Sequence, residues 1–463
     1  MGFTISKMDY RSYVVGVDTP VLLRSGEKVR GINFDNAATT PPFVKVLEAI
    51  NEFAPYYSSI HRGGGYKAKI SSEKYEEARK TVLGFVGGDE KRDVVIFVQN
   101  ATAAINKVAH RLAQQAEEYI SNGLKNNNSK NKEKWIVLST SMEHHSNDLP
   151  WRNNYEVKYI EVDECGRLKF DDLKNKLEKY KGLVKLVTVT GASNVTGYIN
   201  PVHSIAEWAH KYGAKILVDG SQLIPHAPFD MKPYASNKHI DFVVFSAHKM
   251  YAPFGVGVLI GPKDFFVHGD PDYSGGGTVK AVTHEQVIWN DPPFKDEAGT
   301  PNLMGVIALT AAINTLKQIG MKRIEKHEKA LTGQLIQGLK NIDSIELYCT
   351  EEENQERVGI VPFNMKGVSY KQLAEILAQE AGIAVRSGCF CAHPYVQRLL
   401  KVPPDKVNKV MQNPDGFKPG MVRVSFGLYN DHGEVARFLE VLQEIGKHRW
   451  HYLKLYNNYH QSA

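Results

Sequence analysis

Residues suited to chemistry or ligand binding follow five of the predicted strands before residue 262, each at the point where a strand ends. They are Asn100, Ala101 and Thr102, the run STSMEHH (139–145), Ala192, Ser193 and Asn194, then Asp219 and Gln222, and finally Ser246, His248 and Lys249. In an open parallel sheet, ligands bind beyond the carboxyl ends of the strands. We therefore expect these residues to converge on one crevice.

Together they offer an anion site, a flat ring partner, a carboxylate and a lysine, which are the requirements of pyridoxal phosphate (PLP). Lys249 can hold the PLP aldehyde as a Schiff base, and Asp219 can keep the pyridine nitrogen protonated so that the ring accepts electrons. The imidazole of His144 can stack on the ring, and Gln222 can reach its phenolic oxygen. The expected phosphate donors are Ala101 and Thr102, which open a helix, with Ser246 and His248.

Each of these residues has a simpler explanation when it is taken alone. Lys249 could be a solvated surface lysine, and Asp219 could be a helix cap or a turn former. His144 and His145 could be plain loop residues, and no third ligand follows them at the spacing of a metal site. We therefore predict no metal ligand, and the PLP hypothesis depends on the joint pattern.

The elements that must position these residues are short apolar strands alternating with helical stretches. The predicted strands cover residues 94–98, 135–138, 157–162, 183–190, 215–219, 241–245 and 256–260, and the predicted helices cover 102–118, 170–180 and 202–212. Nearly apolar strands separated by helices indicate a mostly parallel sheet covered on both faces, which is an α/β fold. The polar stretch 121–134 is expected to be an exposed insertion loop.

A different pattern begins after Asn302. Residues 303–339 predict one long amphipathic helix. Beyond it we expect a smaller α+β domain, with strands at 358–363, 383–386 and 422–426, a helix opened by Ser369 and a helix over 433–445. The segment 402–420 contains Pro, Asn and Gly and is expected to form a loop rather than core.

Composition excludes several classes of protein. The chain has 463 residues, 42% hydrophobic and 23% charged, which excludes a disordered or fibrous protein. Its net charge of +6 is too dilute to indicate nucleic acid, and no window approaches the ~18 apolar residues of a membrane span. Four cysteines are too few for a secreted disulfide framework, and the N-terminal residues lack a secretion signal. We expect a cytoplasmic protein without nucleic-acid or membrane partners.

Eight motifs resemble, in the same order, those of the cysteine desulfurases and selenocysteine lyases among the class V aminotransferase-fold enzymes. They are FDNAATTPP (34–42), HRGGG (61–65), MEHHSNDLPW (142–151), VDGSQLIPH (218–226), SAHKMYAPFGVG (246–257), EAGTPN (297–302), RSGCFCAHP (386–394) and RVSFGLYN (423–430). The resemblance implies the aspartate aminotransferase-like transferase fold (fold type I) with PLP as cofactor. It also implies an N-terminal segment (1–32) packing on the small domain, a large PLP-binding domain (33–302), and a C-terminal region (303–463) with the linking helix, the small domain and a cysteine loop.

The same resemblance assigns roles to individual residues. It repeats the PLP contacts already listed and implies that Asn194 and Arg423 hold the substrate carboxylate, a role that suits a guanidinium fork. Cys391 matches the nucleophile carried by a mobile loop. Thr278 matches a residue that reaches the phosphate of the neighbouring subunit, which implies a homodimer.

The chain also departs from the pattern of that family. Cys389 and Phe390 stand where related enzymes commonly have two histidines, and the CFC sequence is similar to the amino-terminal domain of molybdenum cofactor sulfurases. Gly65 and Ala103 replace a histidine and a glutamate that are common at these positions, and the insert 402–420 separates Cys391 from Arg423. These departures bear on the sulfur acceptor and the substrate, and leave the cofactor unaffected.

The leading hypothesis is a cysteine desulfurase that converts L-cysteine to L-alanine, forms a persulfide on Cys391 and passes its sulfur to an acceptor protein or thiol. The nearest alternative is another class V PLP lyase, epimerase or aminotransferase, including selenocysteine lyase or an activity like that of molybdenum cofactor sulfurase. A nicotinamide-dependent dehydrogenase is disfavoured because no G-x-G-x-x-G follows the first predicted strand. A non-catalytic binding protein is disfavoured by the intact Lys249, Asp219 and Arg423.

Overall fold

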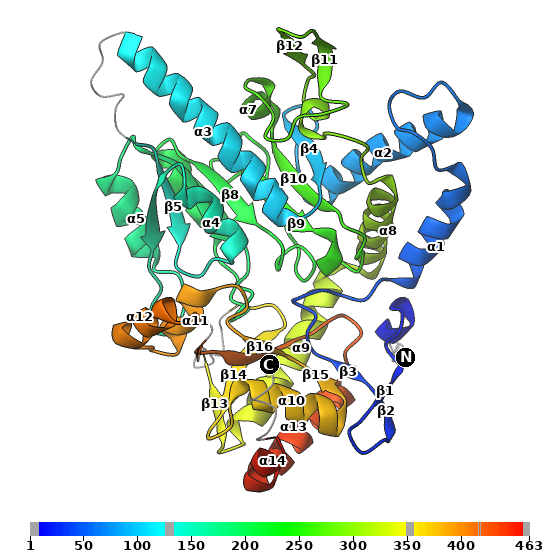
Figure 1. Cartoon of the computed structure of the whole chain (residues 1–463), viewed down its shortest axis with the longest axis vertical. Coiled ribbons are helices and arrows are strands. Elements are labelled where there is room, and N and C mark those ends of the chain that lie inside the picture. The colour runs from blue at the N-terminus through cyan, green and yellow to red at the C-terminus, as the bar shows by residue number, and fades with distance from the viewer. Residues whose placement is uncertain (1–8, 126–133, 349–355, 415, 417, 457–463) are drawn as a thin grey trace, which may run out of the picture.

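The computed structural model describes residues 9–125, 134–348, 356–414, 416 and 418–456. A large sheet with its helices forms the upper part of Figure 1, and a smaller sheet with the yellow to red helices forms the lower part. Cys349, one of the four cysteines of the sequence, lies outside the described residues.

The large sheet has seven strands in the order β4–β10–β9–β8–β7–β5–β6. Their bounds are β4 (Asp93–Val98), β5 (Ile136–Thr140), β6 (Glu156–Ile160), β7 (Val184–Thr190), β8 (Lys215–Asp219), β9 (Phe242–Ser246) and β10 (Gly257–Pro262). Only β10 runs antiparallel to its neighbours, so the expected mostly parallel sheet is confirmed. All seven predicted strands are present, and their ends differ from the prediction by at most two residues.

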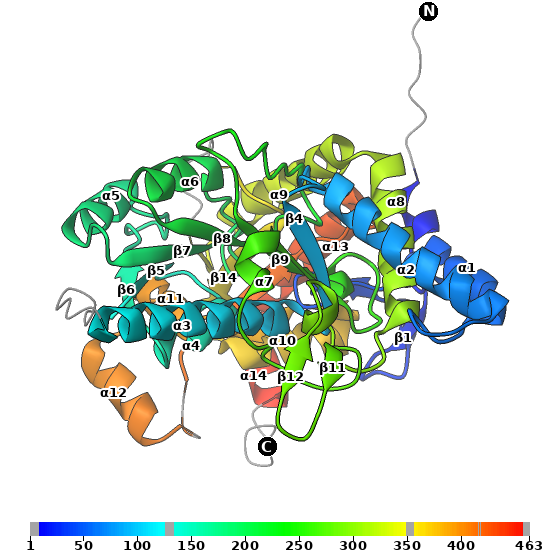
Figure 2. The same ribbon diagram turned by 90° about the horizontal axis from the view of Figure 1, so that it is seen from above.

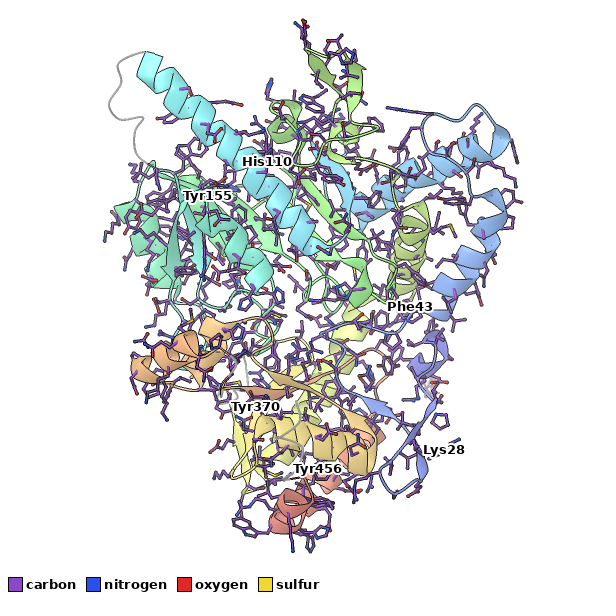
Figure 3. The ribbon with its side chains drawn as sticks, in the orientation of Figure 1. Lys28, Phe43, His110, Tyr155, Tyr370 and Tyr456 are labelled. Atoms are coloured by element: carbon purple, nitrogen blue, oxygen red, sulfur yellow. The ribbon has the colours of Figure 1, made fainter. Side chains whose placement is uncertain are left out.

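Helices cover both faces of this sheet (Figure 2). Helices α3 (Ala101–Lys125) and α4 (Leu149–Arg152) lie on one face, and α5 (Phe170–Lys179) and α6 (Val202–Lys211) lie on the other. On the first face, Tyr155 donates a hydrogen bond from its hydroxyl to the carbonyl oxygen of Ala109 on α3 at 2.5 Å (Figure 3). The burial of both faces explains why the strands are almost wholly apolar.

Further elements flank the large sheet. They are η1 (Tyr10–Tyr13), α1 (Val44–Phe53), η2 (Ala54–Tyr56), α2 (Tyr66–Phe85), η4 (His145–Asn147), η5 (Ala247–Lys249), α7 (Lys263–Val267), the hairpin β11 (Val279–Val282) with β12 (Val287–Trp289), η6 (Phe294–Asp296) and α8 (Leu303–Ile319). The aromatic ring of Phe43, labelled in Figure 3 just before α1, stacks on Tyr251 with ring centroids 4.1 Å apart. This contact ties the start of α1 to the loop that follows β9.

The smaller sheet is antiparallel, with strands in the order β13–β14–β17–β16. Its strands and helices are α9 (Met321–Lys340), β13 (Ile345–Leu347), β14 (Ile360–Met365), α10 (Tyr370–Ala381), β16 (Arg386–Gly388), α11 (His393–Leu399), α12 (Pro404–Gln412), β17 (Met421–Ser425), α13 (His432–Lys447) and α14 (Arg449–Leu455). The predicted helix start at Ser369 is a capping box, in which Ser369 and Gln372 satisfy each other's backbone N–H groups.

Residues 11–33 contact β15 (Ile383–Ala384) and the helices α10 and α13 of the small domain. Strands β1 (Pro20–Leu22) and β2 (Lys28–Arg30) form a hairpin, and β3 (Ile32–Asn33) pairs in parallel with β15. Two ion pairs add to this contact, Arg24 with Glu380 at 2.6 Å and Arg11 with Glu434 at 2.7 Å.

The prediction of a single long helix over 303–339 is wrong, because the structure has two helices there. The chain bends by 77° between α8 and α9, and Gly320 at the bend has φ +93°. Helix α8 packs into the hydrophobic core of the large sheet, whereas α9 packs beside the small sheet. The two halves of this helical pattern, α8 and α9, therefore pack into different hydrophobic cores.

Two loop predictions also need correction. The segment 402–420 was expected to be a loop, but Pro404–Gln412 form α12, which has no buried residue. The stretch 121–134 begins as the last turns of α3, which reaches Lys125, and residues 126–133 lie outside the described part of the chain.

No single helix within the described residues is long and apolar enough to cross a membrane. The bent pair α8 and α9 passes that test only when the two helices are joined, and α8 is mostly buried in the core.

Candidate active site

A cavity of about 280 Å³ lies between the carboxyl edge of the large sheet and the small domain. Every predicted site residue except Thr278 lines it, namely Ala101, Thr102, His144, Asn194, Asp219, Gln222, Ser246, His248, Lys249, Cys391 and Arg423. The expected convergence of the strand ends is therefore observed. The volume is near the lower end, about 300 Å³, of the range usual for small-molecule sites.

Lys249 and Asp219 enter this cavity from neighbouring strands. Asp219 is the last residue of β8, and Lys249 lies in η5, directly after β9. Burial lowers the pKa of Lys249, and the nearby guanidinium of Arg423 lowers it further, while Asp219 opposes both effects. A lowered lysine pKa raises the fraction of neutral amine, which is the form that attacks an aldehyde or accepts a proton.

His144 is held in the turn before η4. Its Nδ1 accepts a hydrogen bond from the backbone N–H of Ser146 at 3.1 Å, and the hydroxyl of Ser146 lies 3.0 Å from the same nitrogen. Burial, with the positive charge of Lys249, lowers the pKa of His144 to about 4. The imidazole is thus neutral at physiological pH, which suits stacking on a flat ring.

The start of α3 presents backbone N–H groups and hydroxyls to the cavity. Asn100 caps this helix by accepting from the N–H of Ala103 at 3.0 Å, and the N–H of Ala101 donates to the hydroxyl oxygen of Ser246 at 2.8 Å. The hydroxyls of Thr102 and Ser146 are 2.7 Å apart. Backbone N–H groups and hydroxyls at a helix start are the groups that bind phosphate.

Gln222 and His248 complete this side of the cavity. The side-chain amide of Gln222 donates to the carbonyl oxygen of Ala37 at 2.7 Å. Its Oε1 is buried and has no hydrogen-bond partner among the residues that the structure describes. Burial and Lys249 lower the pKa of His248 to about 4, so this ring is neutral as well.

Arg423 lies on β17, at the wall formed by the small domain. Its Nη1 donates to the carbonyl oxygen of Asn194 at 2.8 Å, and its Nη2 donates to Asp35 at 3.1 Å. Burial lowers the pKa of Arg423 to about 10, although Asp35 counteracts this effect, so the group stays charged at neutral pH. Its Nε is buried and bonds to no described residue.

The cysteine loop follows β16 and closes the cavity. Phe390 and Cys391 have φ values of +52° and +53°, a backbone conformation that costs about 1–3 kcal/mol for each non-glycine residue. Two hydrogen bonds to backbone carbonyls hold it: the amide of Asn194 donates to Phe390 at 2.7 Å, and the N–H of His145 donates to Cys391 at 2.7 Å. The loop is therefore fastened to the large domain.

The two cysteines of this loop differ in exposure. Cys391 is exposed, whereas Cys389 is buried and donates from its thiol to the carbonyl oxygen of Pro419 at 2.9 Å. Burial raises the pKa of Cys389 to about 11. Cys391 is thus the thiol accessible to a substrate.

Thr278 is the predicted residue that the structure does not bring into the cavity. It is fully buried just before β11, where its hydroxyl donates to the carbonyl oxygen of Gly275 at 2.7 Å. Its predicted contact across a subunit interface stays a prediction.

Five further residues shape the site and were not predicted: Asp35, His145, Ser146, Phe390 and His393. All five lie inside motifs quoted above, so their positions were signalled but their contacts in the site were not. His393 reaches His145 across 248 positions of sequence, and no local spacing indicates such a contact.

Comparison with known proteins is consistent with this geometry. The family model for class-V aminotransferases matches residues 32–438. A cysteine desulfurase of Haloferax volcanii is 33% identical over 417 residues, covering 89% of this chain and 88% of its own length. A probable cysteine desulfurase of Pyrococcus abyssi is 35% identical over 424 residues, covering 90% and 94%.

The fold is shared as well. The apo structure of a cysteine desulfurase from Thermococcus onnurineus NA1 superposes with a TM-score of 0.77 at 32% identity, covering 90% of this chain and 95% of that one. The chain belongs to the class-V aminotransferase family, in the cysteine desulfurase group. The resemblance seen in the sequence motifs, and the fold type I architecture that it implied, are therefore confirmed.

Proposed function

We propose that this chain is a PLP-dependent cysteine desulfurase that converts L-cysteine to L-alanine and retains the sulfur as a persulfide on Cys391. One observation carries the proposal: the exposed thiol of Cys391 lines the same cavity as Lys249 and Asp219. A dehydrogenase or a binding protein needs no such thiol beside a lysine of lowered pKa.

The residues of the cavity fit PLP. The buried Oε1 of Gln222 has no partner among the described residues, so this side-chain amide would be available to the phenolic oxygen. The start of α3, with Thr102, Ser246 and His248, offers donors to the phosphate, and Asp219 can hold the ring nitrogen. When bound, PLP acts as a sink for the electrons released at the substrate carbon atoms.

Arg423 would hold the carboxylate of the substrate, with Asn194 beside it. Its guanidinium is already fixed by Asp35 and by the carbonyl oxygen of Asn194, so little motion is needed before it binds. The buried Nε retains a free donor among the described contacts. A charge-assisted hydrogen bond in this setting is stronger than one in water.

Lys249 would move the proton at Cα of the substrate. Its lowered pKa makes the neutral amine available as the acceptor, and the neutral His144 excludes water from one side of the cavity without competing for that proton. Asp219 then holds the opposite charge close to the lysine when the lysine is protonated.

Cys391 would attack the substrate sulfur. The new bond joins Sγ of Cys391 to the sulfur of L-cysteine, the Cβ–S bond breaks, and its electron pair stays with the carbon skeleton. That carbon gains one proton and leaves as L-alanine, so that one cysteine and one enzyme thiol give one alanine and one persulfide. No external oxidant is needed. The clamped, exposed loop presents the thiol for this attack.

The finer assignments belong to the same proposal. We propose a homodimer in which Thr278 reaches the cofactor phosphate of the partner subunit, an acceptor protein or thiol that removes the sulfur, and a division into residues 1–32, 33–302 and 303–463. The exposed apolar side chains of the hairpin β11–β12, Val282 and Ile288, support an interface near Thr278.

The test is incubation of purified holoenzyme with L-cysteine, with alanine and protein-bound persulfide measured together. We expect equal amounts of both in a single turnover. Cys391→Ser should retain the cofactor absorbance and lose both products, and Cys389→Ser is the matched control because its thiol is buried. If the enzyme formed alanine without persulfide, or if Cys391→Ser still formed products, the activity would be that of a lyase and the desulfurase proposal would be wrong.

A further inference from the structure

A second polar cluster lies at the opposite edge of the large sheet from the candidate active site. Its members are His210 on α6, His239 in the segment 232–240, and Asp241, which directly precedes β9. Strands β8 and β9, each five residues long, run from this edge to Asp219 and Ser246, so the cluster lies about 15 Å from those two residues. The cluster takes no part in the proposed sulfur chemistry.

The possible ligand atoms of the three side chains all lie within 4.8 Å of one another. Nε2 of His210 is 2.8 Å from Oδ2 of Asp241, and Nε2 of His239 is 3.5 Å from Oδ1. Two ligand atoms on one tetrahedral zinc ion are about 3.3 Å apart, since each bond is about 2.0–2.1 Å long. These two separations lie on either side of that value and no separation exceeds 4.8 Å, so the two stacked rings must turn before all three groups reach one metal ion.

Both imidazoles are oriented by backbone carbonyls. Nδ1 of His210 lies 2.8 Å from the carbonyl oxygen of Asn237, and Nδ1 of His239 lies 2.7 Å from that of Ser236. A carbonyl oxygen carries no hydrogen, so each Nδ1 must hold the proton and donate it. Each Nε2 therefore faces Asp241 and is the ring atom left for a metal ion, which is the orientation that second-sphere carbonyls impose on metal-binding histidines.

Asp241 is fixed in the same way. Its carboxylate is 3% exposed, and Oδ2 accepts a hydrogen bond from the backbone N–H of Ile216 at 2.9 Å. The rings of His210 and His239 are stacked, with centroids 4.1 Å apart. Nε2 of His239 is buried and hydrogen-bonds to no described residue. Two imidazole nitrogens and a carboxylate thus gather at one place, and a metal ion bound there would replace the protons through which the imidazoles contact Asp241.

We infer that His210, His239 and Asp241 form a binding site for a divalent first-row transition metal such as Zn²⁺, with solvent as the fourth ligand. Two nitrogen ligands favour this class over Mg²⁺ and Ca²⁺, which take oxygen ligands. The bound ion would join α6 to the segment before β9 and thereby stabilise this edge of the sheet.

Lys215 opposes the cation. Its ammonium lies 3.4 Å from Oδ1 of Asp241 and is 39% exposed. A metal ion must displace this charge from the carboxylate, which the exposed side chain allows. Lys215→Met should therefore increase the metal affinity by several fold, and an unchanged or lower affinity would show that the cluster serves only as an ion pair.

The experiment uses tag-free, chelator-treated holoenzyme carrying Cys391→Ser, so that the active-site thiol takes no metal. Titration with Co²⁺, read by visible absorption, and with Zn²⁺, read by calorimetry, should give one site per chain. His239→Ala and His210→Ala should each lower the affinity at least about 10-fold. His203→Ala, which removes another imidazole from α6, should leave it unchanged.

The inference is overturned if the parent protein binds no metal, or if both ligand variants bind as it does. Should either ligand variant fail to fold, Lys215→Met decides, because unchanged or weaker binding in that variant also contradicts the site. Binding that His203→Ala abolishes would contradict the assigned ligands.

Discussion

The imidazole of His393 stacks on that of His145, with ring centroids 4.7 Å apart and planes 16° from parallel. Nε2 of His145 also accepts a hydrogen bond from the backbone N–H of His393 at 3.2 Å. Burial and the neighbouring His393 lower the pKa of His145, which keeps this nitrogen available as an acceptor. The pair therefore fastens the end of the cysteine loop to the turn that carries His144.

Removal of the His393 side chain should make the loop that carries Cys391 more mobile and leave substrate binding intact. We expect His393→Ala to lower kcat for alanine formation about 10-fold, which corresponds to about 1.4 kcal/mol of barrier, with little change in KM. His393→Gln, which restores a donor, should recover part of the rate, and the exposed His451→Ala should have no effect. A change confined to KM would contradict a positioning role.

The two loop cysteines should react differently with an alkylating reagent. Because burial raises the pKa of Cys389 to about 11, only about one thousandth of its thiol is ionised at pH 8. Iodoacetamide should therefore modify Cys391 and spare Cys389, as read by peptide mass spectrometry. Equal labelling of both thiols in the folded enzyme would show that Cys389 is accessible.

Replacement of Arg423 by lysine should weaken substrate binding. The lysine loses the fork that now contacts Asp35 and the carbonyl oxygen of Asn194, and a hydrogen bond to a charged group contributes about 1.5–3 kcal/mol. We expect KM for L-cysteine to rise about 10- to 100-fold. Arg386→Lys provides the comparison, since its half-exposed side chain lines the same cavity and should matter less.

Acidification should destabilise the fold through two histidines of the site. The pKa values of His144 and His248 are about 4 in the folded chain, below the ordinary value of 6.5, so between these values the unfolded chain binds more protons. Stability should thus be complete above about pH 6.5 and fall as the pH decreases toward 4. Thermal unfolding of the apo enzyme measures this decrease, and His248→Asn should make it shallower. An unchanged slope in that variant would exclude His248 as a contributor.

The bend between α8 and α9 depends on a single glycine. Gly320 has φ +93°, and a Cβ there would meet only the side chain of Arg323 at 4.0 Å, so the expected penalty is conformational. Gly320→Ala should lower the free energy of unfolding by about 1–2 kcal/mol. Gly333→Ala, in the middle of α9 with open space around it, should raise it by about 0.5–1 kcal/mol. Denaturant unfolding of both variants tests the contrast.

The sequence predicts the parallel sheet well because burial on both faces forces the strands to be apolar and short. It does not predict the bend at Gly320, since the helical period of apolar residues continues through that position. The two helices are distinguished only by their packing, because α8 and α9 enter different hydrophobic cores. The exposed helix α12 is missed for a related reason: Pro403 and Pro404 resemble loop residues, yet proline is favoured in the first turn of a helix.

The site is predictable where it depends on strand ends. Asp219 ends a strand, Gln222 and Lys249 lie three residues beyond strand ends, and the sheet topology brings them together. The contact between Asp35 and Arg423 joins residues 388 positions apart, and that between His145 and His393 joins residues 248 apart. Such pairs arise from the docking of two domains, which no local pattern records.

The loop that carries Cys391 is held through the carbonyl oxygens of Phe390 and Cys391, and every amino acid has such an oxygen. The side chain of residue 390 can therefore vary without releasing the loop that presents the thiol of Cys391. The surroundings of the thiol can thus change while its position relative to Lys249 stays the same.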